Sequence, residues 1–129
     1  MTGAATERGR AVLLIEDSAD VRDALVELLE LSGHRVEAVA TGAEGLASAE
    51  RSAPEVIVID VGLPDIDGHE VARRLRARHG GEPFLIAVTG HVRDDDRRAA
   101  AAAGFDRHLG KPVDAEVLER LVALGRPVC

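Results

Sequence analysis

Apolar residues along the chain fall into short runs separated by longer amphipathic segments, and this alternation occurs five times. The runs 11–16, 55–60 and 84–89 are almost continuously apolar. Such runs are typical of strands in a parallel sheet that helices cover on both faces. The run 35–40 alternates with polar residues, as a strand near a sheet edge does, and 105–110 has the weakest strand pattern.

The segments between these runs carry signals for helix ends. Three pairs of residues fit the capping box, in which an N-cap oxygen and an acid three residues later satisfy backbone donors. These pairs are Thr41 with Glu44, Asp67 with Glu70, and Asp20 with Asp23. Asp114 is expected to cap the last helix, and Gly33 and Gly104 are expected to end the first and the fourth helices.

The fourth helix, expected from about Val92 to Ala103, has almost no large apolar side chain. Because alanine buries little area, we expect this helix to be weakly anchored. It is then either an ordinary amphipathic helix whose alanines pack close to the sheet or, by our hypothesis, also a readily displaced element. Asp94 and Arg98 are expected to pair at the i, i+4 spacing.

The resulting order is a strand followed by a helix, five times. Right-handed crossovers around a parallel sheet predict a doubly wound (βα)5 three-layer α/β sandwich. We expect the flavodoxin-like strand order 2-1-3-4-5. In this order the C-terminal ends of the first, third and fourth strands lie side by side, and ligands of such folds bind at that edge of the sheet. We expect one domain at 10–124, with a flexible N-terminal segment at 1–9 and a C-terminal tail at 125–129.

Composition narrows the class of protein. The chain has 129 residues and a net charge of −7, which opposes direct binding to nucleic acid. No apolar run approaches the roughly 20 residues of a membrane span, and no signal-peptide pattern opens the chain. The single Cys129 cannot form an internal disulfide or a zinc cluster. We therefore expect a cytoplasmic protein without membrane insertion.

Polar residues stand at the C-terminal ends of the predicted strands. Glu16 and Asp17 follow the first strand, Asp60 ends the third, Thr89 ends the fourth, and the fifth leads to Lys111. Three carboxylates in one cleft suit Mg²⁺. A carboxylate left partly free, Asp60, could act as a nucleophile that forms an aspartyl phosphate, with Mg²⁺ and Lys111 offsetting the transferred charge.

Four segments together resemble the receiver domains of two-component response regulators, over about Arg10 to Leu124. They are LLIEDSADVRDAL at 13–25, VIVIDVGLPDIDGHEVARRLR at 56–76, LIAVTG at 85–90, and AGFDRHLGKP at 103–112. Asp60, Pro64 and Gly68 stand where the family pattern expects them. The sequence of these segments most resembles receivers attached to hybrid histidine kinases, or single receivers that serve them.

The resemblance implies phosphoryl transfer to Asp60 from a histidine of a kinase or a phosphotransfer domain. Mg²⁺, for which Mn²⁺ is expected to substitute, would be held by Asp17, Asp60 and the backbone carbonyl of Gly62. Glu16 would act partly through water. The protein would be a self-phosphorylating and self-dephosphorylating switch rather than a turnover enzyme.

The resemblance also implies roles for the last strands. Thr89 corresponds to the switch hydroxyl, Lys111 to the phosphate-binding cation, and Pro112 is expected to follow a cis peptide bond. A downstream protein would read the fourth helix, the fifth strand and the fifth helix.

The sequence departs from the family pattern at one switch position. His108 stands where Tyr or Phe is usual, so its coupling to Thr89 is expected to be weaker or pH-sensitive, unless it is a half-exposed histidine without a signalling role. Gly62 and His91 lie at positions that tune dephosphorylation, although His91 also fits a solvated loop residue. The other histidines are expected at the surface: His34, His69 and His79.

Four other classes of function compete with this interpretation. A degenerate receiver would bind proteins independently of phosphorylation, but the intact set of acids, threonine and lysine opposes this. A phosphatase with an aspartyl nucleophile would often carry a second acid where this chain has Gly62, and it would need a substrate cap. Neither GxxxxGK[ST] nor GxGxxG is present, which argues against nucleotide binding. A DNA-binding regulator would need an output domain, which these residues do not encode.

Overall fold

The computed structural model describes residues 9–90 and 93–124, in which five strands alternate with five helices. The strands are β1 (Ala11–Ile15), β2 (Arg35–Val39), β3 (Val56–Asp60), β4 (Phe84–Thr89) and β5 (Arg107–Gly110). The helices are α2 (Ala19–Leu31), α3 (Gly42–Ser52), α4 (Gly68–His79), α5 (Asp94–Ala103) and α6 (Ala115–Leu124). Residues 1–8 and 125–129, in the two predicted terminal segments, lie outside the described residues.

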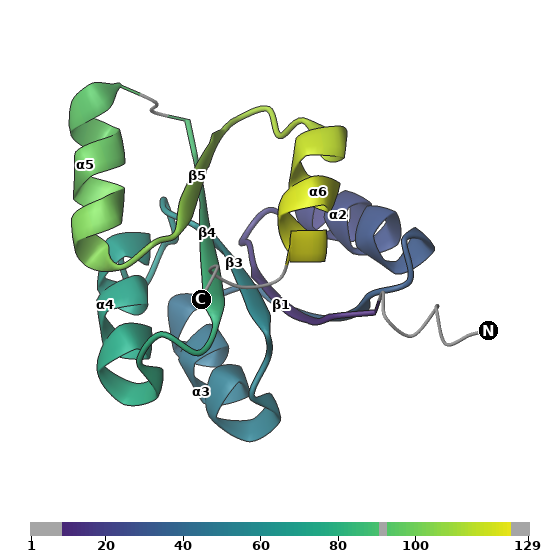
Figure 1. The fold of residues 1–129 in the computed structure, drawn as a ribbon, viewed down its shortest axis with the longest axis horizontal. Coiled ribbons are helices and arrows are strands. Elements are labelled where there is room, and N and C mark those ends of the chain that lie inside the picture. The colour runs from purple at the N-terminus through teal and green to yellow at the C-terminus, as the bar shows by residue number, and fades with distance from the viewer. Residues whose placement is uncertain (1–8, 91–92, 125–129) are drawn as a thin grey trace.

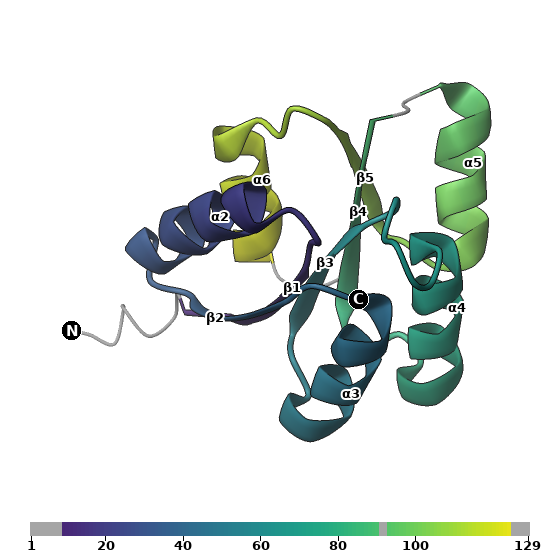
Figure 2. The same ribbon diagram turned by 180° about the vertical axis from the view of Figure 1, so that it is seen from behind.

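All strand pairs are parallel, and the sheet order is β2-β1-β3-β4-β5, as predicted. Helices α2 and α6 cover one face of the sheet, and α3, α4 and α5 cover the other (Figures 1 and 2). This arrangement confirms the doubly wound three-layer sandwich. Within the described part of the chain, no helix has the length and apolar character that a bilayer crossing requires.

Alternate residues of the central strands supply two separate cores. In β1, Leu13 and Ile15 pack on the side of α3, α4 and α5, whereas Val12 and Leu14 pack on the side of α2 and α6. Helix α3 approaches the sheet closely at Gly45, where an added Cβ would lie 2.2 Å from Ile15 Cδ1. The continuous apolar runs are therefore explained by burial on both faces.

The ends of two helices test the predicted caps. Thr41 caps α3 as predicted, because its Oγ1 accepts a hydrogen bond from Glu44 N at 3.1 Å. The prediction that Asp20 begins the first helix was wrong. Ser18 is the N-cap of α2, since its Oγ accepts from Val21 N at 3.4 Å and the helix begins directly after the turn that follows β1.

The predicted box at α4 is only half formed. Asp67 caps the helix by accepting a hydrogen bond from His69 N at 2.7 Å. Glu70 does not return a bond to the cap, because its two oxygens accept instead from Arg73 Nε at 3.2 Å and Arg74 Nε at 3.0 Å. Nearby guanidinium groups therefore outcompete the backbone donor for this carboxylate.

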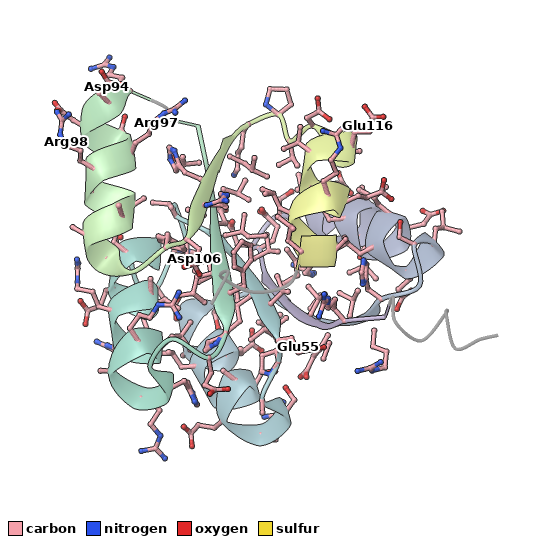
Figure 3. All side chains as sticks on the ribbon, in the orientation of Figure 1. Glu55, Asp94, Arg97, Arg98, Asp106 and Glu116 are labelled. Carbon is pink, nitrogen blue, oxygen red and sulfur yellow. The ribbon has the colours of Figure 1, made fainter. Side chains whose placement is uncertain are left out.

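Helix α5 is held by few apolar contacts, as predicted. Its buried residues are Ala100 and Ala103, and Figure 3 shows charged side chains projecting from its first turns. The predicted pair of Asp94 with Arg98 was wrong, because Arg98 binds Asp95, its i, i+3 neighbour on the helix surface.

Arg76 of α4 joins four elements at the opposite end of the sheet from Asp60. Its Nε donates to Gly104 O at 2.8 Å, and its Nη1 donates to Pro83 O at 2.7 Å and Gly80 O at 3.0 Å. Its Nη2 donates to Asp106 Oδ2 at 2.7 Å. One half-buried guanidinium thus connects the C-terminal ends of α4 and α5 with the segments that lead into β4 and β5.

His34 is buried, at 7% exposure, so its predicted surface location was wrong. The residue directly precedes β2, and its Nδ1 accepts a hydrogen bond from Arg10 N at 3.1 Å. Burial lowers the pKa of His34, and the charge of Arg10 acts in the same direction, whereas Glu119 and Glu55 oppose it. The folded protein therefore favours the neutral imidazole.

Replacing Arg76 with alanine is expected to lower the free energy of unfolding by about 3 kcal/mol, because Asp106 and three carbonyls lose their donor in a half-buried site. Chemical denaturation followed by circular dichroism measures this. The matched control is Arg74→Ala, which removes an exposed pair with Glu70 and is expected to cost less than about 1 kcal/mol. Equal losses for the two variants would contradict the role of Arg76.

His34 makes the unfolding free energy depend on pH. Because its folded pKa lies below its unfolded value of about 6.5, its contribution is complete above that pH and declines as the pH falls toward the folded pKa. The slope is at most about 1.4 kcal/mol per pH unit for one proton. Denaturation between pH 7.5 and 5.5, a window of about two units around that reference pKa, measures it for wild type and His34→Asn. The asparagine variant is expected to lose this slope, and an unchanged slope would contradict the assignment.

Candidate functional site

Asp60 is the last residue of β3, at the C-terminal edge of the sheet between β1 and β4. Its side chain is almost fully buried, with the residue 4% exposed. Oδ1 accepts a hydrogen bond from Gly62 N at 3.0 Å and lies 3.3 Å from Lys111 Nζ. A backbone amide and an ammonium group therefore both hold one carboxylate oxygen.

Glu16 and Asp17 follow β1, the neighbour of β3 in the sheet. Glu16 is 2% exposed, and its Oε2 accepts a hydrogen bond from Ser18 N at 3.0 Å, whereas Asp17 is exposed. The backbone carbonyls of Glu16 and Asp17 accept from Arg22 Nη1 at 3.0 and 3.5 Å. Arg22 and Ser18 thus fix the turn that carries the two acids.

The carboxylates of Glu16, Asp17 and Asp60 offer oxygens that all lie within 4.8 Å of one another. Burial raises the pKa of the Glu16 carboxyl, and Asp60 raises it further, while the Ser18 amide and Lys111 oppose this. One ammonium group leaves three carboxylates only partly compensated. A small cluster of hard oxygen ligands with excess negative charge fits Mg²⁺, so the residues present can hold this metal.

Thr89 and Lys111 complete the edge of the sheet. Thr89 ends β4, is 7% exposed and aligns with Gly110 of β5. Its carbonyl accepts a hydrogen bond from Lys111 N at 2.8 Å, and the Lys111–Pro112 peptide bond is cis. The backbone therefore ties the segment that carries the lysine directly to the end of β4.

Three further residues were singled out by the sequence. Gly62 is exposed, and an added Cβ there would meet only Asp60 Oδ1, at 3.8 Å, so the position above the carboxylate is open. His108 lies half-buried on β5 beside Ala87, and among the described residues its buried Nδ1 has no hydrogen-bond partner. Burial lowers the pKa of His108, and the charge of Arg97 adds to this. His91 lies outside the described residues.

The sequence did not indicate the roles of Ser18 and Arg22 in this site. Ser18 donates its backbone amide to the Glu16 carboxylate, and Arg22 donates its guanidinium group to the backbone carbonyls of the acid turn. Because any residue type supplies a backbone carbonyl, no residue pattern identifies the partner of such a donor. The spacing of Arg22 from the acid pair becomes informative only once α2 begins at Ala19.

A family model described as the response regulator receiver domain matches residues 12–123. The chain is 40% identical over 112 residues to an uncharacterized 14.6 kDa protein from Leptolyngbya boryana, covering 86% of each chain. It is 40% identical over 116 residues to the transcriptional regulatory protein PrrA of Mycobacterium tuberculosis, covering 89% of this chain and 49% of PrrA. The chain therefore spans about half the length of that regulator.

Solved structures of receiver domains are also similar to this chain. The receiver domain of the sensor histidine kinase PA1611 from Pseudomonas aeruginosa, which has a magnesium ion coordinated in its active site cleft, is 32% identical, with a TM-score of 0.82. The match covers 91% of this chain and 97% of that one. A CheY-like receiver domain protein from Methanospirillum hungatei is 29% identical with the same TM-score of 0.82, covering 88% and 90% of the two chains.

Replacing Asp17 with asparagine is expected to weaken Mg²⁺ binding by about tenfold or more, because it removes one charged oxygen ligand from the cluster. Isothermal titration calorimetry with MgCl₂ measures the affinity. Asp20→Asn is the matched control, since it removes the same charge from an exposed position in the first turn of α2. Equal weakening in both variants would indicate a general effect of charge and contradict direct ligation by Asp17.

Proposed function

Because the chain belongs to the response regulator receiver domain family, we propose that it accepts a phosphoryl group on Asp60 from a phosphohistidine. The donor is a histidine kinase or a histidine phosphotransfer domain. The observation that carries the proposal is the position of Asp60, buried at the sheet edge with Lys111 Nζ 3.3 Å from its Oδ1 and two further carboxylates beside it. The protein is a phosphoacceptor switch rather than a turnover enzyme.

In the proposed transfer, an Asp60 oxygen attacks the phosphorus atom, the P–N bond breaks, and the imidazole leaves with its electron pair. Lys111 offsets charge on the phosphoryl oxygens. Asp17, Asp60 and the backbone carbonyl of Gly62 would hold Mg²⁺, and Glu16 would act partly through water. When bound, the metal, for which Mn²⁺ substitutes, supplies positive charge to the transferred group.

The phosphoryl group then changes the surface of the protein through Thr89, whose hydroxyl donates a hydrogen bond to it. His108, on the neighbouring strand, is the second switch residue of this proposal. The open position at Gly62 leaves the acyl phosphate accessible to water, so Gly62 and His91 set the rate of dephosphorylation. The scarcity of large apolar contacts on α5 supports displacement of this helix as the response.

Partners follow from the same proposal. A kinase or phosphotransfer domain supplies the phosphoryl group, and a downstream protein reads the face formed by α5, β5 and α6. We place the protein in the cytoplasm with its donor, as is typical of receiver domains.

Incubation with acetyl phosphate and Mg²⁺ is expected to add the mass of one phosphoryl group to the wild type and none to Asp60→Asn, because the amide is a poor nucleophile. Intact mass spectrometry measures the adduct. Asp23→Asn, an exposed acid on α2, is the control and is expected to behave as wild type.

An adduct that persists in Asp60→Asn would move the acceptor to another residue. A wild type without an adduct, also after incubation with a phosphorylated phosphotransfer domain, would contradict phosphoacceptance and favour a phosphorylation-independent binding module.

A further inference from the structure

The N-terminus of α3 is capped by a residue from a different part of the chain. Asp65, in the loop between β3 and α4, accepts hydrogen bonds from Gly42 N at 2.8 Å through Oδ1 and from Ala43 N at 3.0 Å through Oδ2. These are amides of the first turn, which lack acceptors within the helix. The Ala43 and Gly42 amides hold the pKa of Asp65 below its usual value.

The local cap of α3 is independent of Asp65. Thr41 Oγ1 binds Glu44 N, and Glu44 Oε1 accepts a hydrogen bond from Ala40 N at 3.3 Å. Asp65 therefore adds two bonds to an end that already has its own cap. The additional bonds constrain the loop that carries Asp65 as much as they constrain the helix.

Close packing accompanies these bonds. A Cβ added at Gly42 would lie 3.0 Å from Val71 Cγ2 and 3.1 Å from Ile66 Cβ, so the helix end approaches both the loop and α4 as closely as a glycine permits. Ile66 is itself packed against the core beneath α3 and α4. The half of the loop around Asp65 is thus fixed against α3.

The other half of the same loop contacts Asp60. Gly62 N donates to Asp60 Oδ1 at 3.0 Å, and Gly68 N donates to Val61 O at 2.9 Å. An added Cβ at Gly68 would lie 2.5 Å from Val61 Cα, so the end of the loop packs directly on its beginning. Between these fixed points, the loop is held to α3 by Asp65.

We propose that Asp65 is a positioning residue for the phosphoacceptor site, which fixes the loop 61–67 on α3 and thereby the Gly62 backbone at Asp60. This inference rests on the proposed function of Asp60. Asp65 acts on the site through Gly62 and does not contact Asp60 itself in the proposal. Because coupling between two sites is reciprocal, a ligand at Asp60 also changes the bonds that Asp65 makes with α3.

The test compares Asp65→Ala with Thr41→Ala, because each removes cap bonds from the same helix end and only the first releases the loop. Nuclear magnetic resonance follows the Gly62 amide, and titration with MgCl₂ gives the affinity. Asp65→Ala is expected to shift the Gly62 resonance toward its unbonded position. It is also expected to weaken Mg²⁺ binding severalfold, less than the roughly tenfold expected for Asp17→Asn. Thr41→Ala is expected to leave both unchanged.

A second readout uses reciprocity. In the wild type, MgCl₂ is expected to shift the Gly42 and Ala43 amide resonances, and in Asp65→Ala it is expected to leave them in place. Asp65→Asn keeps one acceptor oxygen and is expected to lie between the two. Equal changes in Asp65→Ala and Thr41→Ala, or an unchanged Gly62 resonance in Asp65→Ala, would overturn the proposal.

The outcome separates this inference from the proposed function. If the wild type and Asp65→Ala gain the phosphoryl adduct at the same rate and bind Mg²⁺ with the same affinity, the positioning role alone is refuted. A wild type without an adduct refutes phosphoacceptance, while the amide resonances and the Mg²⁺ titration still decide whether Asp65 positions Gly62.

Discussion

Repulsion among three carboxylates at one edge of the sheet is the constraint on which the site depends. Glu16, Asp17 and Asp60 offer oxygens within 4.8 Å of one another, and two of these residues are almost fully buried. Burial of like charges is unfavourable unless hydrogen bonds and positive charge compensate it. The protein supplies the Ser18 and Gly62 amides and the Lys111 ammonium group, and the remaining negative charge suits a divalent cation.

The strands and helices could be predicted because their causes are local in sequence. Continuous apolar runs indicated strands buried on both faces, and the strand order followed from the resemblance and from the way such sheets are wound. The convergence of Asp60, Thr89 and Lys111 was predictable for the same reason, since parallel strands bring their C-terminal ends to one edge. Predicting the location of these three residues required no knowledge of side-chain contacts.

Other features could not be predicted because they depend on bonds between a side chain and a distant backbone group. His34 was expected at the surface, yet it accepts a hydrogen bond from Arg10 N, 24 residues away. Asp65 binds the amides of a helix that begins 23 residues earlier. The sequence pattern also does not indicate which donors compete for one acceptor. Glu70 pairs with two guanidinium groups of its own helix instead of the backbone donor at the cap.

The contacts of α5 are unevenly distributed along its length. Its C-terminal end is bound through Gly104 to Arg76, whereas its first turn is exposed and charged. A helix of 10 residues is about 15 Å long, so a rotation of about 10° around the bound end displaces the first turn by roughly 2.5 Å. With Gly104 as the fulcrum, such a rotation would move the end of α5 that follows the strand carrying Thr89 the most, and the end bound to Arg76 the least.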